Sequence, residues 1–227
     1  MGGAHNATVP RAVVFDFDGT LADSYPAITA SVNFVRAGYG LPPLDEAGVR
    51  RYVGRGPAYL LEHTVPGGEI EKDLARYRAH HPSVMRAGTR LLPGAAGTLA
   101  ALRQNGLALG VCSNKPVAFT RQLLDYLGIA RFLGAVLGPE DVRRPKPAPD
   151  MLQAALSRLH VTAQDALYVG DMVVDVETAR QAGVAVWVVA TGSDDRDTLA
   201  AARPDRLLRD LGELASLLGR PEQPGQA

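Results

Sequence analysis

Short apolar runs alternate with helix-like stretches over most of this chain, and the alternation limits the folds available to it. Five runs have the length and the Val-, Leu- and Phe-rich content of buried strands, at residues 12–17, 107–113, 133–138, 166–171 and 184–190. Helical patterns occupy residues 94–106, 116–128, 149–160 and 173–183. Strands that alternate with helices form βαβ units. The pattern therefore predicts an α/β fold, a doubly wound parallel sheet with helices on both faces.

One segment, residues 24–92, departs from this alternation and shows no convincing strand. Helical patterns fill it, at residues 24–38, 45–53, 57–64 and 69–86. A helical block directly after the first strand indicates an insertion. We therefore expect an α/β core domain formed by residues 10–23 and 93–219, and a helical domain formed by residues 24–92. Residues 1–9 and 220–227 are expected to be flexible termini, since the tail "RPEQPGQA" has a disordered composition.

Charge and composition exclude several classes of function. Lys plus Arg and Asp plus Glu both number 24, and this zero net charge argues against a nucleic-acid or membrane-surface binder. No apolar run reaches the ~18 residues of a membrane span. The start shows no signal-peptide pattern, and the single cysteine, Cys112, excludes an internal disulfide. We expect a cytoplasmic protein with no nucleic-acid or membrane partner, either a monomer or a homodimer.

The first predicted strand ends in two carboxylates, in the stretch "DFDGT" (16–20). Because side chains alternate along a strand, Asp16 and Asp18 project to one side, at the end of the strand where ligands bind in open α/β sheets. Two ionised carboxylates so close repel each other, and hard Mg²⁺ removes that repulsion. Gly19 permits a tight turn and a close backbone approach. The alternative is that Asp-Gly serves only as a turn former.

Polar groups also follow three later strands or loops. Ser113 and Asn114 stand at a strand end before a helix that begins with Pro, where hydroxyl and amide groups suit a phosphate. Lys146 lies between two prolines, which restrict the backbone around its ammonium. Asp171 and Asp175 follow a fourth strand. Helix capping by Ser113, Asn114 or Asp171, and an ordinary Pro-rich loop around Lys146, are the alternatives.

Taken together and in this order, the four stretches resemble the motifs of the haloacid dehalogenase-like hydrolases. The matching residues are the DxDGT stretch at 16–20, Ser113, Lys146 and the GDxxxD stretch at 170–175. The resemblance implies a Rossmann-like core, and the helical insertion is similar to the family's first type of cap domain. Within the family, stretches such as "RPKPAPDML" and "ALYVGDMVVDVETARQAG" resemble the bacterial phosphoglycolate phosphatases.

The resemblance implies roles for these residues. Asp16 would be the nucleophile that forms an aspartyl-phosphate, and Asp18 the general acid and base. Mg²⁺ would be held by Asp16, Asp171 and the backbone carbonyl of Asp18, with Asp175 beside the metal-bound water. The expected phosphate-binding residues are Gly19, Thr20, Ser113, Asn114 and Lys146. Ser113 and Lys146 are expected to be catalytic as well.

These roles imply Mg²⁺-dependent hydrolysis of a small phosphate monoester, with 2-phosphoglycolate as the expected substrate. Alternatives are a phosphatase of another small phosphorylated metabolite (a sugar phosphate, a nucleotide or pyrophosphate), a phosphomutase similar to β-phosphoglucomutase, and a non-catalytic module. A carboxylate substrate calls for a cation from the cap, and Arg55 in "VGRGP" is the candidate. The alternative for Arg55 is a solvated surface side chain.

Overall fold

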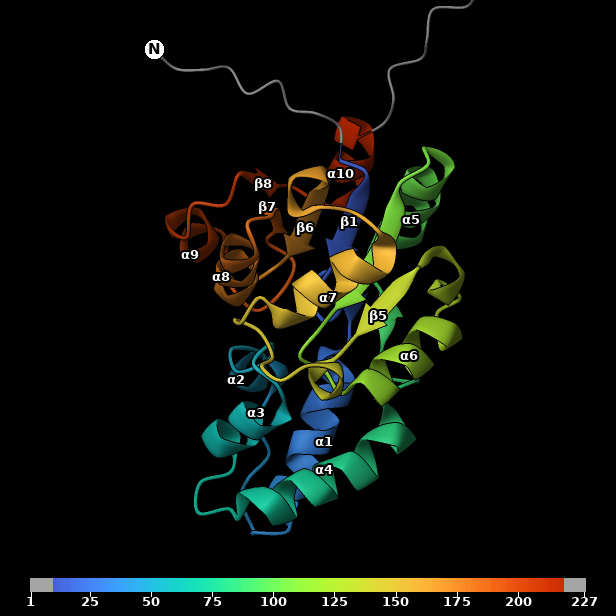
Figure 1. The fold of residues 1–227 in the computed structure, drawn as a ribbon. Helices are drawn as coiled ribbons and strands as arrows, with labels where there is room; N and C mark the ends of the chain where they lie inside the picture. The colour runs from blue at the N-terminus through green and yellow to red at the C-terminus, as the bar shows by residue number, and fades with distance from the viewer. Residues whose placement is uncertain (1–9, 219–227) are drawn as a thin grey trace, which may run out of the picture.

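A six-stranded sheet forms the centre of the computed structural model, which describes residues 10–218 (Figure 1). The strand order is β5-β4-β1-β6-β7-β8, and every neighbouring pair is parallel. The strands are β1 Ala12–Phe15, β4 Ala108–Cys112, β5 Ala135–Leu137, β6 Ala166–Gly170, β7 Ala185–Val189 and β8 Arg206–Leu208. The predicted α/β fold with a parallel sheet is therefore confirmed.

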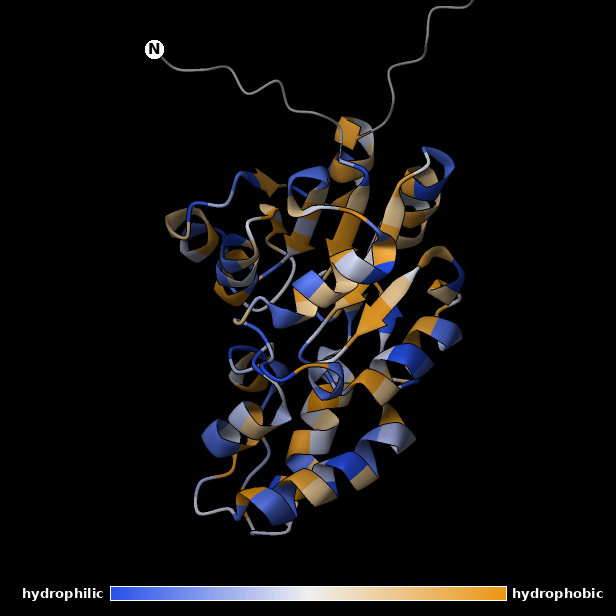
Figure 2. Ribbon diagram, viewed as in Figure 1, coloured by the Kyte–Doolittle hydropathy of each residue, from blue (hydrophilic) through white to orange (hydrophobic). Residues whose placement is uncertain are grey.

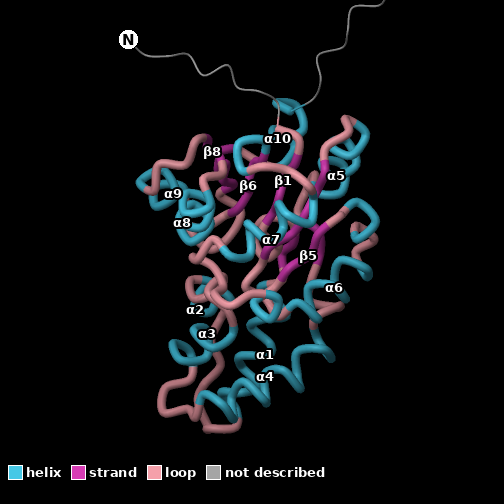
Figure 3. The backbone as a smooth tube through the Cα atoms, in the orientation of Figure 1, coloured by secondary structure: helices cyan, strands magenta, loops and turns pink. Residues whose placement is uncertain are grey.

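Helices cover both faces of this sheet (Figure 3). One apolar core joins Phe15 to helices α5 (Ala95–Gln104), α6 (Val117–Tyr126) and α10 (Leu211–Leu218). A second core joins Val14 to helices α7 (Asp150–Leu159), α8 (Val173–Ala182) and α9 (Arg196–Ala201). Adjacent residues of β1 thus enter opposite layers, which explains why all four residues of β1 are apolar; the central strands are mostly apolar as well (Figure 2). Three 3₁₀ turns complete this part, at Ala130–Phe132, Pro139–Asp141 and Ala163–Asp165.

Four helices follow β1 and pack against one another beyond the carboxyl edge of the sheet (Figure 1). They are α1 Tyr25–Ala37, α2 Glu46–Arg50, α3 Pro57–Thr64 and α4 Ile70–Val84, called here the helical unit. The unit has its own apolar core, which includes Ile28, Val32 and Leu61. Its separate core is compatible with a domain of its own, although the boundaries at residues 24 and 92 remain a prediction.

The expectation of no strand between residues 24 and 92 is wrong in one detail. Strand β3 (Arg90–Leu91) lies in this segment. It pairs antiparallel with β2 (Ala22–Asp23), which directly precedes the segment, so the chain leaves and re-enters the α/β part through a two-stranded ribbon. Strands of two residues are too short to produce a periodic sequence pattern. Helix α2 is also shorter than the predicted helix at 45–53.

The remaining expectations concern the ends of the chain and membranes. The predicted flexible termini, residues 1–9 and 220–227, lie outside the described residues. None of the helices formed by residues 10–218 combines the length and the apolarity that crossing a lipid bilayer requires.

Candidate active site

The register of the central strands brings the predicted site residues to one edge of the sheet. Phe15, the last residue of β1, pairs with Val111 of β4 on one side and with Val169 of β6 on the other. The three strands therefore end at the same level. Residues just beyond these ends must lie close together, and the acidic, hydroxyl and amide groups predicted as a site occupy those positions.

Asp16 lies at the centre of this edge and is 2% exposed. Its carboxylate accepts a hydrogen bond from the backbone N–H of Phe17 at 2.7 Å and forms an ion pair with the Lys146 Nζ at 3.0 Å. Burial raises the pKa of Asp16 from 3.8 to about 6, although Lys146 acts in the opposite direction. The buried carboxylate is therefore short of compensating positive charge.

Asp16, Asp171 and Asp175 each place a carboxylate oxygen within 4.8 Å of the other two. Asp171 accepts hydrogen bonds from the Thr20 hydroxyl at 2.7 Å and from the backbone N–H of Ser193 at 3.1 Å. Burial, followed by the charges of Asp175 and Asp16, raises the pKa of Asp171 well above its usual value. Three clustered carboxylates with two raised pKa values are the oxygen-rich, electron-rich setting that a hard divalent cation prefers.

The charges at this edge do not balance. Two lysines face four aspartates, which leaves two negative charges without a partner among the described side chains of the site: Asp16, Asp18, Asp171, Asp175, Lys115 and Lys146. Buried charges of this kind are normally paired or bind a metal. The oxygen-rich donor set therefore fits a divalent cation such as Mg²⁺.

Asp175 has both oxygens occupied by the protein. One accepts from the Lys146 Nζ at 2.7 Å and from the Tyr168 hydroxyl at 3.2 Å. The other accepts from the backbone N–H groups of Asp171 and Met172, at 3.1 Å each. Asp175 thus holds the lysine and the loop that carries Asp171 in place. Tyr168 was not singled out from the sequence, because a tyrosine inside a buried strand gives no signal of its polar contact.

Asp18 is paired with a different lysine from Asp16. It accepts a hydrogen bond from the Ser24 hydroxyl, and Lys115 Nζ lies 3.3 Å from each of its two oxygens. The side chain of Lys115 is only 3% exposed. Sequence reasoning assigned no role to Lys115. A signal existed, because the chain has only three lysines and Lys115 directly follows the predicted Ser113 and Asn114.

Contacts of two residues predicted to bind phosphate indicate other roles. The Asn114 amide donates to the carbonyls of Gly54 and Lys146, at 3.0 Å each, and accepts from the Lys146 N–H at 3.0 Å. Both amide hydrogens are thus used. The Thr20 hydroxyl donates to Asp171. These side chains therefore position Lys146 and Asp171, and the expected phosphate contacts of Asn114 and Thr20 stay a prediction.

The N–H of Gly19 donates to the Ala22 carbonyl at 2.8 Å, and the expected phosphate contact of this residue stays a prediction. Glycine is still required at this position. The backbone has φ +84°, and a Cβ would lie 2.5 Å from both the Asp171 carboxylate and the Tyr25 hydroxyl. Ser113 is buried within the site, and its side chain lowers the pKa of Asp16.

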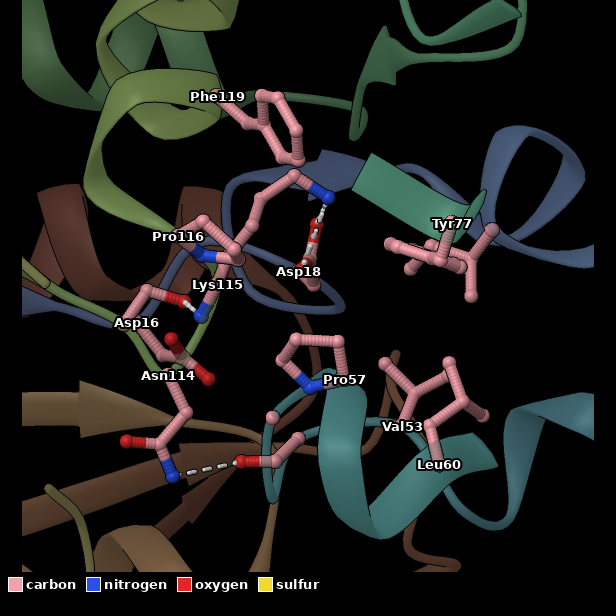
Figure 4. Close-up of a pocket in the computed structure, with 14 residues that line it drawn as sticks. Asp16, Asp18, Val53, Pro57, Leu60, Tyr77, Asn114, Lys115, Pro116 and Phe119 are labelled. Atoms are coloured by element: carbon pink, nitrogen blue, oxygen red, sulfur yellow. Dashed lines mark hydrogen bonds and ion pairs between the residues drawn. The ribbon is translucent and has the colours of Figure 1, made fainter. Parts of the chain in front are cut away.

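A narrow pocket opens onto Asp16 and Asp18 from the side of the helical unit (Figure 4). Its volume is about 30 Å³, room for only a water molecule or two. The wall opposite the aspartates is mostly apolar and consists of Ile28, Val53, Leu60, Tyr77 and Phe119. This largely apolar wall limits the access of water to the carboxylates.

Arg55 does not line this pocket. It is exposed, lies over the Tyr59 ring at 5.5 Å, and lines a neighbouring cavity of about 290 Å³ together with Arg78. The two spaces share Gly56, Pro57, Asn114 and Pro116. The structure therefore brings together the predicted core residues but separates Arg55 from them.

The parallel sheet and the buried aspartate cluster at its carboxyl edge define an α/β enzyme equipped to hold a divalent cation. The chain belongs to the haloacid dehalogenase-like hydrolases, whose family model matches residues 13–189. The resemblance found in the four motifs is thereby confirmed.

Individual relatives cover nearly the whole chain. It is 40% identical to the phosphoglycolate phosphatase of Rhodospirillum rubrum, over 96% of this chain and 94% of that protein. It is 33% identical to the phosphoglycolate phosphatase of Yersinia pseudotuberculosis, over 93% and 94%. Among solved structures, a Bacteroides fragilis protein assigned to the haloacid dehalogenase-like hydrolases superposes with a TM-score of 0.85 at 29% identity, over 90% of this chain and 99% of that one.

Proposed function

We propose that this protein is a Mg²⁺-dependent phosphatase that hydrolyses 2-phosphoglycolate, a small phosphorylated metabolite, to glycolate and phosphate. The single observation that carries the proposal is the position of Asp16, a buried carboxylate that lines a narrow pocket and lies beside the Lys146 ammonium group and two further aspartates. The two relatives named phosphoglycolate phosphatase, which align along nearly their whole length, support the choice of substrate.

The reaction has two steps. An Asp16 oxygen attacks phosphorus, and the bond between phosphorus and the ester oxygen breaks as Asp18, acting as the general acid, gives a proton to the leaving alcohol. Asp18 then takes a proton from water, whose oxygen attacks the aspartyl-phosphate and releases inorganic phosphate. Both carboxyl groups thereby return to their starting states.

The surrounding residues bind and orient the phosphoryl group. Lys146 Nζ lies 3.0 Å from Asp16, where it can bind a phosphoryl oxygen, and Ser113 is buried beside it. Mg²⁺, when bound by Asp16, Asp171 and the Asp18 carbonyl, supplies positive charge that offsets the charge of the phosphoryl group. Asp175 keeps Lys146 and the Asp171 loop in position beside that ion.

We assign the role of a cap to the helical unit. Its residues Val53, Leu60 and Tyr77 close the pocket over the aspartates, and the remaining volume of about 30 Å³ is too small for substrate entry without movement of the unit. A closed pocket of this size favours a small leaving group.

The test is phosphate release from 2-phosphoglycolate by the purified protein, with Mg²⁺ and with EDTA. We expect activity with Mg²⁺, none with EDTA, and a fall of kcat by a factor of about a thousand or more in Asp16→Asn. Asp197→Asn, which changes an exposed aspartate of α9, is the control and should retain full activity. Substantial turnover by Asp16→Asn would refute the nucleophile. Faster hydrolysis of sugar phosphates, nucleotides or pyrophosphate would refute the substrate but leave the phosphatase intact.

A further inference from the structure

The short distance between the two anionic groups of 2-phosphoglycolate limits where its carboxylate can bind. A single methylene group joins the carboxyl carbon to the ester oxygen. In the proposed reaction, Asp18 must contact that ester oxygen in order to protonate it. The carboxylate therefore lies beside Asp18, within the small pocket, and the neighbouring cavity that Arg55 lines is not the place for it.

Lys115 is the one basic side chain among the residues that line this pocket in the described chain. The helical unit contributes apolar groups and the backbone of Gly54 and Gly56 to the same space. A carboxylate that enters a largely apolar, closed pocket must be paired with a cation, because burying an unpaired charge is costly. The pocket offers Lys115 for that pairing.

The geometry of Lys115 suits this role. Its Nζ lies 3.3 Å from both oxygens of Asp18, and Figure 4 shows the side chain extending into the pocket toward Asp18, on the side of Phe119. An ammonium group has three hydrogens, so Lys115 can keep its contact with Asp18 and still donate to a second carboxylate. Because the side chain is 3% exposed, water weakens that interaction little.

We propose that Lys115 is the specificity-determining residue of the site and binds the carboxylate of a short substrate, so that the enzyme selects phosphate monoesters with an acidic leaving group. This inference rests on the proposed phosphatase function. Lys115 belongs to the loop before α6, in the α/β part of the chain. The inference therefore assigns substrate selection to this part and not to Arg55 of the cap.

The test compares two substrates that differ only in the recognised group. 2-Phosphoglycolate carries a carboxylate, and 2-hydroxyethyl phosphate carries a neutral hydroxymethyl group in its place. The wild-type protein should prefer the former in kcat/KM. Lys115→Met should reduce the ratio of the two kcat/KM values about 10- to 100-fold, the range expected for one hydrogen bond between charged groups. Any effect of the substitution on Asp18 acts on both substrates and cancels in the ratio.

Lys72→Met is the matched control, because Lys72 is an exposed residue of α4 paired with Glu69. It should leave the ratio unchanged. Lys115→Gln serves as a second variant if Lys115→Met does not fold. An equal loss for both substrates would overturn the inference and confine Lys115 to an effect on Asp18. A wild-type protein without preference for the carboxylate would overturn it as well.

Binding measurements separate this inference from the proposed function. 3-Phosphonopropionate is the analogue of 2-phosphoglycolate that cannot be hydrolysed, and 3-hydroxypropylphosphonate is its neutral counterpart. Calorimetry should show tighter binding of the carboxylate analogue to the wild-type protein and loss of that difference in Lys115→Met. A protein that hydrolyses neither ester would refute the proposed function, and these two affinities would still decide the role of Lys115. Equal affinities of the wild-type protein for both analogues would refute that role.

Discussion

At the scale of single residues, the site is dominated by carboxylates that the fold holds in an unfavourable environment. Asp16 is surrounded by the charges of Lys146, Asp175 and Asp171, and burial outweighs the lysine in raising its pKa to about 6. The pKa of Asp171 is raised as well, and burial is again the main cause. Because the folded state disfavours the ionised forms of Asp16 and Asp171, these carboxylates lower the free energy of unfolding of the metal-free protein at neutral pH.

The pH dependence of stability follows from Asp16. Its raised pKa means that the folded state holds this proton more tightly than the unfolded state, so its stabilising contribution is full below about pH 4 and is lost as the pH rises through about 6. In EDTA, the free energy of unfolding of Asp16→Asn should therefore rise relative to wild type between pH 4 and pH 7.5, by up to about 3 kcal/mol. Urea unfolding at several pH values measures this difference. A difference that stays constant with pH would contradict the assignment.

At the scale of elements, the loop that follows β7 connects the helical unit to the acidic cluster. Arg50, the last residue of α2, donates to the carbonyls of Gly192 at 3.0 Å and Thr191 at 2.6 Å, and lies over the Tyr25 ring at 4.2 Å. The same loop donates the Ser193 N–H to Asp171. A Cβ on Gly192 would overlap the Asp171 carboxylate, so only glycine permits this approach. The closed position of α2 and the position of Asp171 are therefore coupled.

Loss of the Arg50 side chain should weaken the contact between α2 and the loop that contains Thr191 and Gly192. Hydrogen bonds from a charged group contribute roughly 1.5–3 kcal/mol, so Arg50→Ala should lower kcat/KM for 2-phosphoglycolate about tenfold or more. Amide exchange of residues 191–193 should also become faster, which a local defect in α2 alone would not cause. Arg51→Ala removes the adjacent, exposed arginine and is the control. Unchanged exchange in the loop of Arg50→Ala would show that α2 does not hold it.

At the scale of the whole molecule, the cluster joins the ends of two strands that are distant in sequence. Asp16 follows β1 and Asp171 follows β6, so an ion that binds both carboxylates is bound only by the folded chain. Binding restricted to the native state stabilises it by about 2.7 kcal/mol at a concentration of 100 times the Kd.

Mg²⁺ should therefore raise the Tm of the wild-type protein at pH 7.5, compared with NaCl of equal ionic strength. The increase should be smaller at pH 5, where the raised pKa values of Asp16 and Asp171 favour their protonated forms. Asp171→Asn should remove most of it at either pH, as measured by scanning calorimetry. A full Mg²⁺-dependent increase in Asp171→Asn would show that the ion binds elsewhere.

The sequence by itself determined the α/β class, the helical insertion and the acidic residues at the strand ends, because each depends on local patterns. Alternating apolar runs specify the sheet, and "DFDGT" and "GDMVVD" mark where its strands end. The ribbon of β2 and β3, strand β8 and helices α9 and α10 were not assigned, since elements of two to eight residues give little local signal.

Only the tertiary structure decided which polar groups face one another. Asn114 and Lys115 are adjacent in sequence, but their side chains have different partners in the folded chain. Asn114 donates to the Lys146 backbone carbonyl, and Lys115 contacts Asp18. It also places Arg55 at a neighbouring cavity and Arg50 on the loop beside Asp171. These pairings span many residues and depend on strand register and helix packing, which local sequence patterns do not encode.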